Sequence, residues 1–401
     1  MLATPASAPY VSYVSPALTP GRELAAGLAG QAAPIVLPFE LAANHVLVRA
    51  RVNGVAGWLI VDTGSSLTAL DTEWAKSIGA RPAQQAQVLG TGNVTTTLAT
   101  VDSVQLPGVD MRNLAAVLVP LDAVSRVHGR AIRGTLGYDF LSCYAVEIDY
   151  ARRELRLHDP ATYEYAGAGV VVPVSLQHRV PVVHATVTPA GRAPIAARLL
   201  LDLGTSLFVA LLNTPFVEEH RIADGTSPAV DAPLGTGVGG RVLGRVTRLR
   251  ELRLGDLAVS EPTVGLGRER VGFVGSTFVD GTVGAPLFER TTMILDYARA
   301  RVIFEPGPRF ATPYEYDMSG LQLGAGDHGA ALVTFVVAGG PAQVAGVQVG
   351  DEVVAVDGRG AGELSLEAIR GALRIAGARP ELTIRRGGSE RRVRLTLRRL
   401  V

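Results

Sequence analysis

Two acidic turns, 140 positions apart, are the strongest chemical signal in this 401-residue chain. The first follows the apolar run 58–61 and begins with Asp62; the second follows the apolar run 199–201 and begins with Asp202. A continuous apolar run indicates a strand buried on both faces, and the glycine two positions after each acid lets the backbone bend. A carboxylate at the end of such a strand is costly to bury unless it faces a cleft or serves a chemical task. Strand formation does not require an acid at both places, so both are candidate catalytic residues.

An internal repeat surrounds these two turns. Segment 234–237 repeats segment 89–92 after 145 residues, and segment 281–288 repeats segment 134–141 after 147 residues. The pair of strands expected in 293–304 repeats an earlier pair at the same offset of 147. Landmarks in one order and at a nearly constant offset predict a duplicated lobe.

Strands and hairpins must position the two acids. Strand 45–52 alternates apolar and polar residues, the following Asn-Gly pair indicates a tight turn, and the chain then returns along 58–61 to the first acid. A short helix is expected at 71–79. Each half also contains a glycine-rich tip without the features of a phosphate loop, which predicts a hairpin flap. The flap residues are Gly90, Thr91, Gly92, Gly235, Thr236 and Gly237.

Composition narrows the classes of protein. The chain is 47% apolar and 19% charged with a net charge of +1, which is typical of a globular protein and does not favour a nucleic-acid partner. A single cysteine and histidines without paired spacing predict neither a disulfide, a metal site nor another cofactor. The absence of an 18-residue apolar run predicts no membrane span.

The first 32 residues form an Ala- and Pro-rich arm that we expect to be disordered. They do not show the pattern of a signal peptide. The location therefore stays open: periplasmic or secreted if an export signal has been removed, and cytoplasmic otherwise.

The repeated pattern of acid turn, flap and closing strands across residues 33–306 resembles the single-chain aspartic peptidases of the pepsin and retropepsin superfamily. Short lobes, no disulfides and no aromatic residue at either flap tip resemble its retropepsin-like bacterial branch. The resemblance implies a mainly β fold with one β-barrel-like lobe at 33–165, a second at 166–308 and a cleft between them. It also implies an aspartic endopeptidase that hydrolyses peptide bonds of a peptide or protein substrate, with Asp62 and Asp202 activating a water.

The resemblance also implies supporting residues beside the two acids. Gly64 and Gly204 would let the turns approach each other and donate backbone N–H groups to the acids. Ser65 and Thr205 would donate hydroxyl hydrogen bonds to the outer carboxylate oxygens, which favours ionisation.

The second turn departs from the family pattern at Leu203, where Thr or Ser is expected. In the family these hydroxyls bond across the lobes, so Thr63 is expected to lack its symmetric partner. A neutral hydrogen bond contributes about 0.5 to 1.5 kcal/mol, too little for its loss alone to abolish a site that keeps both carboxylates. The alternative is a catalytically inactive homologue that acts as a peptide-binding or scaffold protein.

A third unit follows the Pro306-Gly307-Pro308 break, and residues 314–401 resemble a small α+β PDZ domain. A helix is expected at 365–373 with a serine cap. The loop that would bind the terminal carboxylate of a C-terminal peptide comprises Gly320, Leu321, Gln322 and Leu323. The unit could equally pack on the protease lobes as a structural cap.

Overall fold

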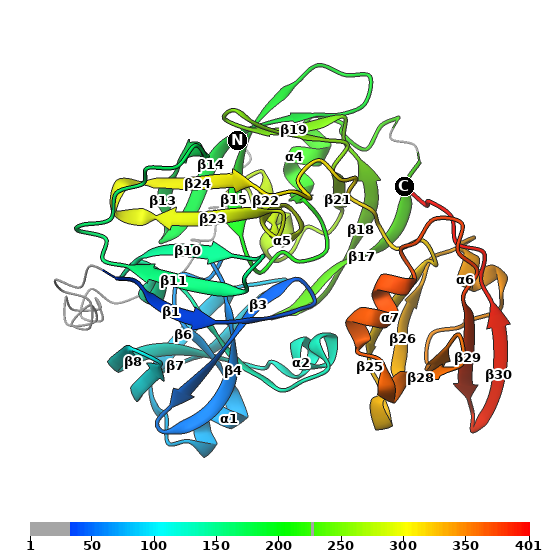
Figure 1. The fold of residues 1–401 in the computed structure, drawn as a ribbon, viewed down its shortest axis with the longest axis horizontal. Helices are drawn as coiled ribbons and strands as arrows, with labels where there is room; N and C mark the ends of the chain where they lie inside the picture. The colour runs from blue at the N-terminus through cyan, green and yellow to red at the C-terminus, as the bar shows by residue number, and fades with distance from the viewer. Residues whose placement is uncertain (1–32, 226–227) are drawn as a thin grey trace, which may run out of the picture.

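The computed structural model describes residues 33–225 and 228–401 and is built mainly of β-strands (Figure 1). The Ala- and Pro-rich arm predicted at 1–32 lies outside the described residues. Two lobes form the larger body, and a smaller domain lies beside them at the C-terminal end of the chain (Figure 1). The predicted mainly β architecture of two lobes followed by a small α+β domain is confirmed.

An eight-stranded sheet forms the first lobe, in the order β2-β3-β4-β9-β5-β8-β7-β6, and β3 also pairs with β7. Its strands are β2 (Glu40–Ala42), β3 (His45–Val52), β4 (Val55–Val61), β5 (Ala69–Asp71), β6 (Arg81–Leu89), β7 (Asn93–Leu106), β8 (Val109–Val119) and β9 (Ile132–Leu136). Its helices are α1 (Thr72–Ser77), α2 (Asp122–His128) and α3 (Tyr138–Leu141). Helix α1 is the predicted short helix, and the Asp71 carboxylate caps it by accepting a 2.9 Å hydrogen bond from the Trp74 N–H.

The second lobe repeats this arrangement. Its strands are β13 (Ser175–Gln177), β14 (Val180–Thr188), β15 (Ile195–Asp202), β16 (Ala210–Leu212), β17 (Val230–Gly237), β18 (Gly240–Arg248), β19 (Glu251–Leu254), β20 (Leu257–Ser260), β21 (Thr263–Gly267) and β22 (Gly281–Gly284). Its helices are α4 (Thr214–Glu219) and α5 (Ala285–Phe288). The parallel pair β15–β22 corresponds to β4–β9, and the parallel pair β16–β21 corresponds to β5–β8. The duplication inferred from the sequence is therefore present in the topology.

Repeated glycines explain why the two lobes fold alike. A Cβ on Gly134 would lie 2.3 Å from the Ala69 carbonyl oxygen, and a Cβ on Gly281 would lie 2.3 Å from the Leu211 carbonyl oxygen. Both approaches are closer than a side chain allows. Glycine at offset 147 therefore lets the strand beside each acid-bearing strand pack against the neighbouring backbone.

A six-stranded sheet joins the lobes in the order β1-β11-β10-β23-β24-β12. Its strands are β1 (Ile35–Pro38), β10 (Ala145–Asp149), β11 (Glu154–His158), β12 (Val170–Pro173), β23 (Thr291–Asp296) and β24 (Arg301–Pro306). Strands β10 and β23, which occupy equivalent places in the two repeats, pair directly. One continuous apolar core runs through both lobes, and this shared core fixes the lobes relative to each other.

The C-terminal domain has a sheet in the order β25-β26-β27-β29-β30, with β28 beside β27. Its strands are β25 (Leu321–Ala325), β26 (Ala331–Val336), β27 (Glu352–Val356), β28 (Arg359–Gly360), β29 (Glu381–Arg386) and β30 (Ser389–Arg394), and its helices are α6 (Pro341–Val344) and α7 (Leu366–Ala372). Ser365 caps α7 as predicted by accepting a hydrogen bond from the Ala368 N–H. Among the described residues, no helix is both long enough and apolar enough to pass through a bilayer.

The C-terminal domain packs on the second lobe through a small apolar cluster. Phe208 of the lobe stacks on Tyr316 with ring centroids 6.2 Å apart, and Val337, Leu400 and Val401 join the same cluster. Edge strand β25 lies beside α2 of the first lobe. The domain therefore contacts both lobes and borders the space between them.

Candidate active site

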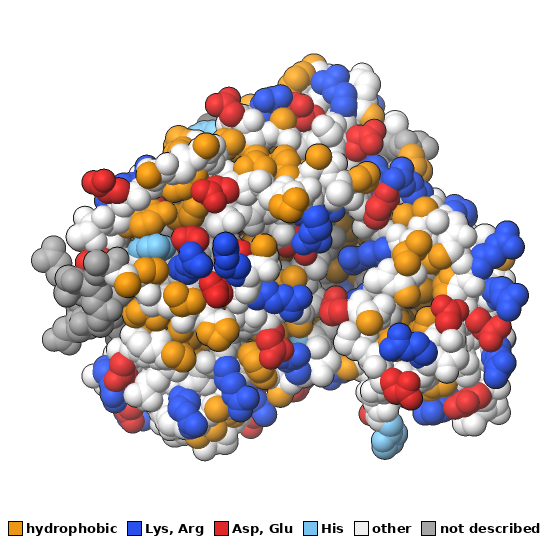
Figure 2. Space-filling model, in the orientation of Figure 1, with side chains coloured by type: hydrophobic (Ala, Val, Ile, Leu, Met, Phe, Trp, Pro, Cys, Tyr) orange, Lys and Arg blue, Asp and Glu red, His pale blue; other side chains and the backbone are white. Residues whose placement is uncertain are grey.

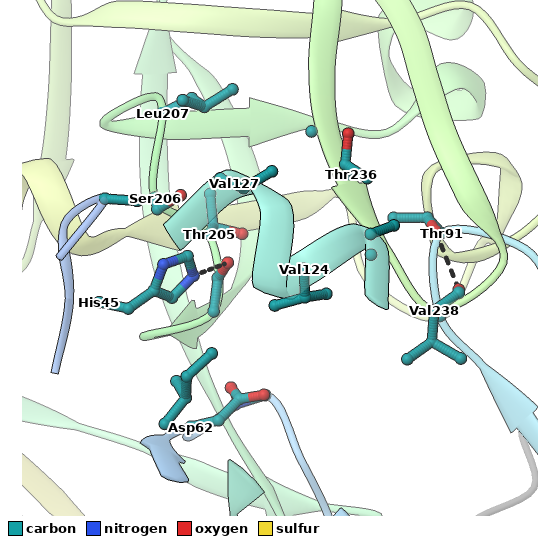
Figure 3. A pocket seen from close by; sticks show the side chains of 18 of the residues that line it. His45, Asp62, Thr91, Val124, Val127, Thr205, Ser206, Leu207, Thr236 and Val238 are labelled. Carbon is teal, nitrogen blue, oxygen red and sulfur yellow. Dashed lines mark hydrogen bonds between the residues drawn. The ribbon is translucent and has the colours of Figure 1, made fainter. Parts of the chain in front are cut away.

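The first predicted acid stands where β4 ends. Its backbone N–H donates to the Leu136 carbonyl of β9 at 3.0 Å, which anchors the start of the turn. The N–H of Gly64 then donates to Asp62 Oδ1 at 2.9 Å. The predicted backbone donor is therefore in place, and the carboxyl group points into the cavity beside the first lobe (Figure 3).

The second acid has the same backbone setting at the end of β15. The N–H of Gly204 donates to Asp202 Oδ1 at 2.8 Å. The Thr205 hydroxyl donates to Asp202 Oδ2 at 2.7 Å and also contacts the Thr282 hydroxyl at 2.9 Å. Both oxygens of Asp202 therefore accept hydrogen bonds, as the resemblance implied for this lobe.

The two carboxyl groups face each other across the junction of the lobes. A Cβ on Gly204 would lie 3.0 Å from Oδ1 of Asp62 and 3.0 Å from Oδ1 of Asp202, and a Cβ on Gly64 would lie 2.5 Å from Asp202 Oδ1. Only glycine fits at either position. The pKa of Asp62 is raised well above its usual range, mainly by burial and secondly by the neighbouring Asp202 carboxyl. This favours a protonated Asp62.

The cross-lobe contact of Thr63 is made with backbone groups of the second lobe. Leu203 has no hydroxyl to act as the symmetric partner of Thr63, and Thr63 Oγ1 donates to the Leu201 carbonyl at 2.7 Å and accepts from the Leu203 N–H at 2.9 Å. Both partners are backbone groups, so this contact does not use the side chain at position 203. Thr63 is 1% exposed, as is Leu203, which packs in the core instead of bonding back.

The role expected for Ser65 is wrong in this structure. Its hydroxyl donates to the Leu67 carbonyl at 2.6 Å and not to Asp62. Thr135, which occupies the position of Thr282 in the first repeat, has a buried hydroxyl without a hydrogen-bond partner among the described residues. The two halves of the site are therefore chemically unequal: hydroxyls hold the second acid but not the first. The repeated Gly-Thr pair at offset 147 could have revealed both threonines.

The flaps of the two lobes meet at their tips. The Thr91 hydroxyl contacts the carbonyl oxygens of Val238 at 2.8 Å and Gly240 at 2.9 Å, and the Gly92 N–H donates to the Val238 carbonyl at 3.2 Å (Figure 3). Gly239 has a φ of +108°, a conformation that favours glycine. All six predicted flap residues lie in the two hairpins that bear these tips, and five of them line the cavity: Gly90, Thr91, Gly235, Thr236 and Gly237.

A cavity of about 570 Å³ lies between the two acids, Asp62 and Asp202, and the flaps. Its apolar wall includes Leu121 and Val124 from the first lobe and Leu200 and Leu207 from the second. Val124 and Val127 of α2 also line this space, and Figure 3 shows them in view between Asp62 and the flap residues Thr91 and Val238. The cavity is therefore partly apolar, and Asp62 and Asp202 lie on its wall.

Two buried histidines next to the second acid had no signal in the sequence. His45 Nε2 lies 3.0 Å from the Gly204 carbonyl, His45 Nδ1 lies 3.0 Å from His128 Nε2, and His128 Nδ1 lies 2.8 Å from the Val124 carbonyl. Carbonyl oxygens only accept, so three hydrogen bonds would need three protons, one more than two neutral imidazoles carry. Burial lowers the pKa of His45 to about 3 and that of His128 to about 4, so the pair is neutral at neutral pH.

The loop predicted to bind a carboxylate precedes and enters β25. The N–H groups of Gly320 and Leu321 both donate to Asp317 Oδ1, at 2.6 and 3.1 Å. The side-chain amide of Gln322 donates to the Pro233 carbonyl of the second lobe at 2.8 Å, and Leu323 is buried. Among residues 33–225 and 228–401, no three His, Cys, Asp or Glu side chains gather as a set of metal ligands.

Comparisons with known proteins agree with this geometry. Residues 48–140 match a family model described as aspartyl protease, and residues 332–386 match a PDZ domain model. The chain therefore combines an aspartyl protease domain with a C-terminal PDZ domain, as the sequence resemblance implied.

A similar solved structure is the aspartic proteinase from Irpex lacteus. The similarity has a TM-score of 0.44 at 14% identity and covers 70% of this chain and 99% of that chain. No curated protein matches the sequence.

Proposed function

We propose that the protein is an aspartic endopeptidase in which Asp62 and Asp202 activate a water molecule. The observation that supports this most directly is the meeting of two equivalent carboxyl groups around Gly64 and Gly204. Two carboxyl groups that lie side by side hold one shared proton more readily than none, because two adjacent negative charges repel each other. The pair then offers one acid and one base to the same substrate.

The unequal hydrogen bonding assigns the roles. Asp202 accepts from the Gly204 N–H and the Thr205 hydroxyl, an arrangement that suits a carboxylate, whereas no hydroxyl of the described residues donates to Asp62, whose pKa is raised. Asp202 is therefore the base that takes a proton from water, and Asp62 is the acid that protonates the substrate carbonyl oxygen.

The reaction proceeds in two steps with balanced proton transfers. As the water oxygen attacks the carbonyl carbon, Asp202 takes a proton from the water and Asp62 gives its own proton to the carbonyl oxygen. The product of this step is a geminal diol. Asp62 then takes back a hydroxyl proton, Asp202 gives its proton to the amide nitrogen, and the C–N bond breaks. A carboxylic acid and an amine leave, and the dyad returns to its first state.

The flaps and the cavity suit an extended peptide. The tips at Thr91 and Val238 close over the side of the cavity opposite the acids, which excludes water once a substrate is bound. The apolar wall favours side chains without charge next to the scissile bond.

Cleavage of a peptide library between about pH 3 and about pH 8 tests this function. We expect the wild type to cleave, and Asp62→Asn and Asp202→Asn each to lose nearly all activity with non-additive effects, because the dyad acts as a unit. Asp256→Asn is the matched control, since this exposed acid lies outside the cavity. Substantial cleavage by either dyad variant would refute the assignment.

A non-catalytic peptide binder is the second candidate function. The turned-away Ser65 hydroxyl and the apolar Leu203 are the observations that favour it. Peptide binding without cleavage by the wild type at any pH would support the binder and refute the endopeptidase.

A further inference from the structure

The turn that carries Asp202 is held from the first lobe. Asn44 and His45, in the hairpin between β2 and β3, reach two carbonyls of this turn. Asn44 Nδ2 donates to the Ser206 carbonyl at 2.8 Å, and His45 Nε2 lies 3.0 Å from the Gly204 carbonyl. Figure 3 shows the His45 ring directed at the turn that bears Ser206. These two side chains form a hairpin clamp on the acid-bearing turn of the other lobe.

The available hydrogen-bond partners assign the proton of the His45 ring. The Val124 carbonyl lies inside α2, where the N–H four residues later is its usual donor, whereas His45 is the one donor to the Gly204 carbonyl among the described residues. His45 Nε2–H therefore donates to Gly204, and His45 Nδ1 accepts from the Nε2–H of His128 at 3.0 Å. If the pair gains one proton, His128 Nδ1 donates to Val124 and the bond to Gly204 remains.

The bond to the Gly204 carbonyl orients the peptide group that leads to Thr205. The N–H of this peptide group donates to the Asp202 carbonyl at 3.1 Å, and the Thr205 carbonyl accepts from the Ala285 N–H at 2.8 Å. A peptide group is planar, so a fixed carbonyl also fixes the N–H on its other side. The Thr205 hydroxyl then lies 2.7 Å from Asp202 Oδ2. His45 thus acts on Asp202 through Thr205.

The second lobe has no equivalent of His45. The hairpin turns 43–44 and 178–179 have the same form, because all four residues have a φ between +49° and +69°. The register of the following strands places Val180 where the first lobe has His45. Val180 has no side-chain donor for the turn of Asp62. The hairpin clamp therefore belongs to one acid only, the same acid that receives a hydroxyl bond.

The support of His45 extends to the C-terminal domain. His128, which bonds the His45 ring, is the last residue of α2. This helix borders the recess between the two lobes and the C-terminal domain, and Figure 2 shows that recess in the orientation of Figure 1. Across this boundary Arg370 of α7 donates to the Val127 carbonyl at 2.9 Å. The helix behind the hairpin clamp is therefore bonded to the C-terminal domain as well as to its own lobe.

We propose that His45 is a positioning residue for Asp202. Supported by Asn44 and His128, it holds the turn so that the Thr205 hydroxyl stays on Oδ2 of this carboxylate while Asp202 takes a proton from water. The proposal deepens the proposed endopeptidase function and rests on it for the role of Asp202 as the base. The hairpin clamp bonds to backbone and not to substrate, so its loss should slow the chemical step and leave substrate affinity nearly unchanged.

A double-mutant cycle tests whether His45 acts through Thr205. His45→Leu removes the donor and should lower kcat at least about tenfold, with KM within about twofold of the wild type. Adding Thr205→Ala should cost little more than Thr205→Ala alone, because both changes remove the same hydroxyl contact. His45→Gln keeps a side-chain N–H donor and should recover most of kcat. His184→Leu, the same substitution at an exposed histidine outside the cavity, is the matched control.

Asn44→Gly tests the other half of the hairpin clamp and decides the case in which His45→Leu does not fold. Glycine accepts the φ of +62° at this position, so the change removes only the donor to the Ser206 carbonyl. The kcat should fall several-fold, again without adding to the effect of Thr205→Ala. Losses that multiply with that of Thr205→Ala, or an unchanged kcat in the clamp variants, would overturn the proposal.

Carbon-13 NMR of the aspartate carboxyl carbons measures the positioning without cleavage. The Asp202 signal, identified by its loss in Asp202→Asn, is followed from about pH 3 to about pH 8. A donated hydroxyl bond favours the carboxylate form, so in His45→Leu the midpoint of this signal should move to higher pH by about 0.5 pH unit or more. His184→Leu should leave the midpoint unchanged.

Other charged groups near Asp202 require one further comparison. Asp62 and His45 interact with Asp202, His128 interacts with His45, and Arg130 and Arg370 act electrostatically on His128. Because His45→Leu also deletes an imidazole, Thr205→Ala is measured beside it. Thr205→Ala should move the Asp202 midpoint in the same direction, and adding His45→Leu should not move it further. A further movement in the double variant would assign the effect to the imidazole itself and overturn the proposal.

The endopeptidase and the positioning role fail separately. Movement of the Asp202 midpoint without cleavage by the wild type would refute the endopeptidase and support the positioning role. Cleavage by the wild type with an unmoved midpoint in His45→Leu would support the endopeptidase and refute the positioning role.

Discussion

Replacing Thr63 by valine should loosen the seam between the catalytic turns. Valine keeps the shape of threonine but removes the hydroxyl, which bonds the Leu201 carbonyl and the Leu203 N–H in a fully buried setting. Each of the two orphaned backbone groups costs about 1 to 3 kcal/mol, so the free energy of unfolding should fall by about 2 to 6 kcal/mol. For a protein of this size, that change lowers the melting temperature by about 3 to 8 °C.

Calorimetry and peptide cleavage measure the two consequences. The kcat of Thr63→Val should fall, because both turns carry a catalytic acid and the hydroxyl helps to hold them in register. Thr63→Ser is the control: it keeps the hydroxyl and removes one methyl group, so it should lie much closer to the wild type. If Thr63→Val and Thr63→Ser melt at the same temperature and retain equal kcat, the reasoning about this contact is wrong.

The remaining predictions concern the unequal acids, the buried histidines and the domain contact. Thr205→Ala should lower kcat/KM at least about tenfold while Ser65→Ala changes it little, because only the Thr205 hydroxyl reaches a catalytic carboxyl; equal losses would contradict this. Because the pKa of His45 is lowered in the folded state, the unfolded chain binds the proton more readily, and the free energy of unfolding falls as pH drops below about 6.5. In urea unfolding, His45→Gln should lose about 2 kcal/mol less of this free energy than the wild type between about pH 7 and about pH 5. Removing residues 314–401 should lower the melting temperature of the lobes because it uncovers Phe208, and an unchanged value would show that the lobes form an independent unit.

The sequence alone was sufficient for the repeated architecture. Acid turns, flaps and closing strands recur at nearly constant offsets. Each depends on a residue type that can be recognised in the sequence alone: an acid, a glycine or an apolar run. At the two turns and in the strands beside them, neighbouring atoms approach too closely for any side chain, so glycine is required. This requirement makes the motif easy to recognise in the sequence. The match of residues 48–140 and 332–386 to aspartyl protease and PDZ models agrees with that interpretation.

The tertiary structure decided which hydrogen-bond partners the hydroxyl side chains have. Thr63 bonds one backbone acceptor and one backbone donor on the other lobe although position 203 has no hydroxyl, whereas the Ser65 hydroxyl bonds the Leu67 carbonyl instead of Asp62. Neither choice is encoded in residue type, because a hydroxyl can bond whichever polar group its rotamer reaches.

Long-range packing was equally invisible in the sequence. His45 and His128 lie 83 positions apart and pair only because α2 folds back over the cavity, and Arg370 reaches α2 from a domain more than 200 positions away. Such contacts depend on how whole elements dock, through apolar clusters such as the one around Phe208, and not on any local pattern. The sequence therefore determined the two candidate catalytic acids and the two kinds of domain, while docking of the domains decided that these acids and β25 would line one cavity.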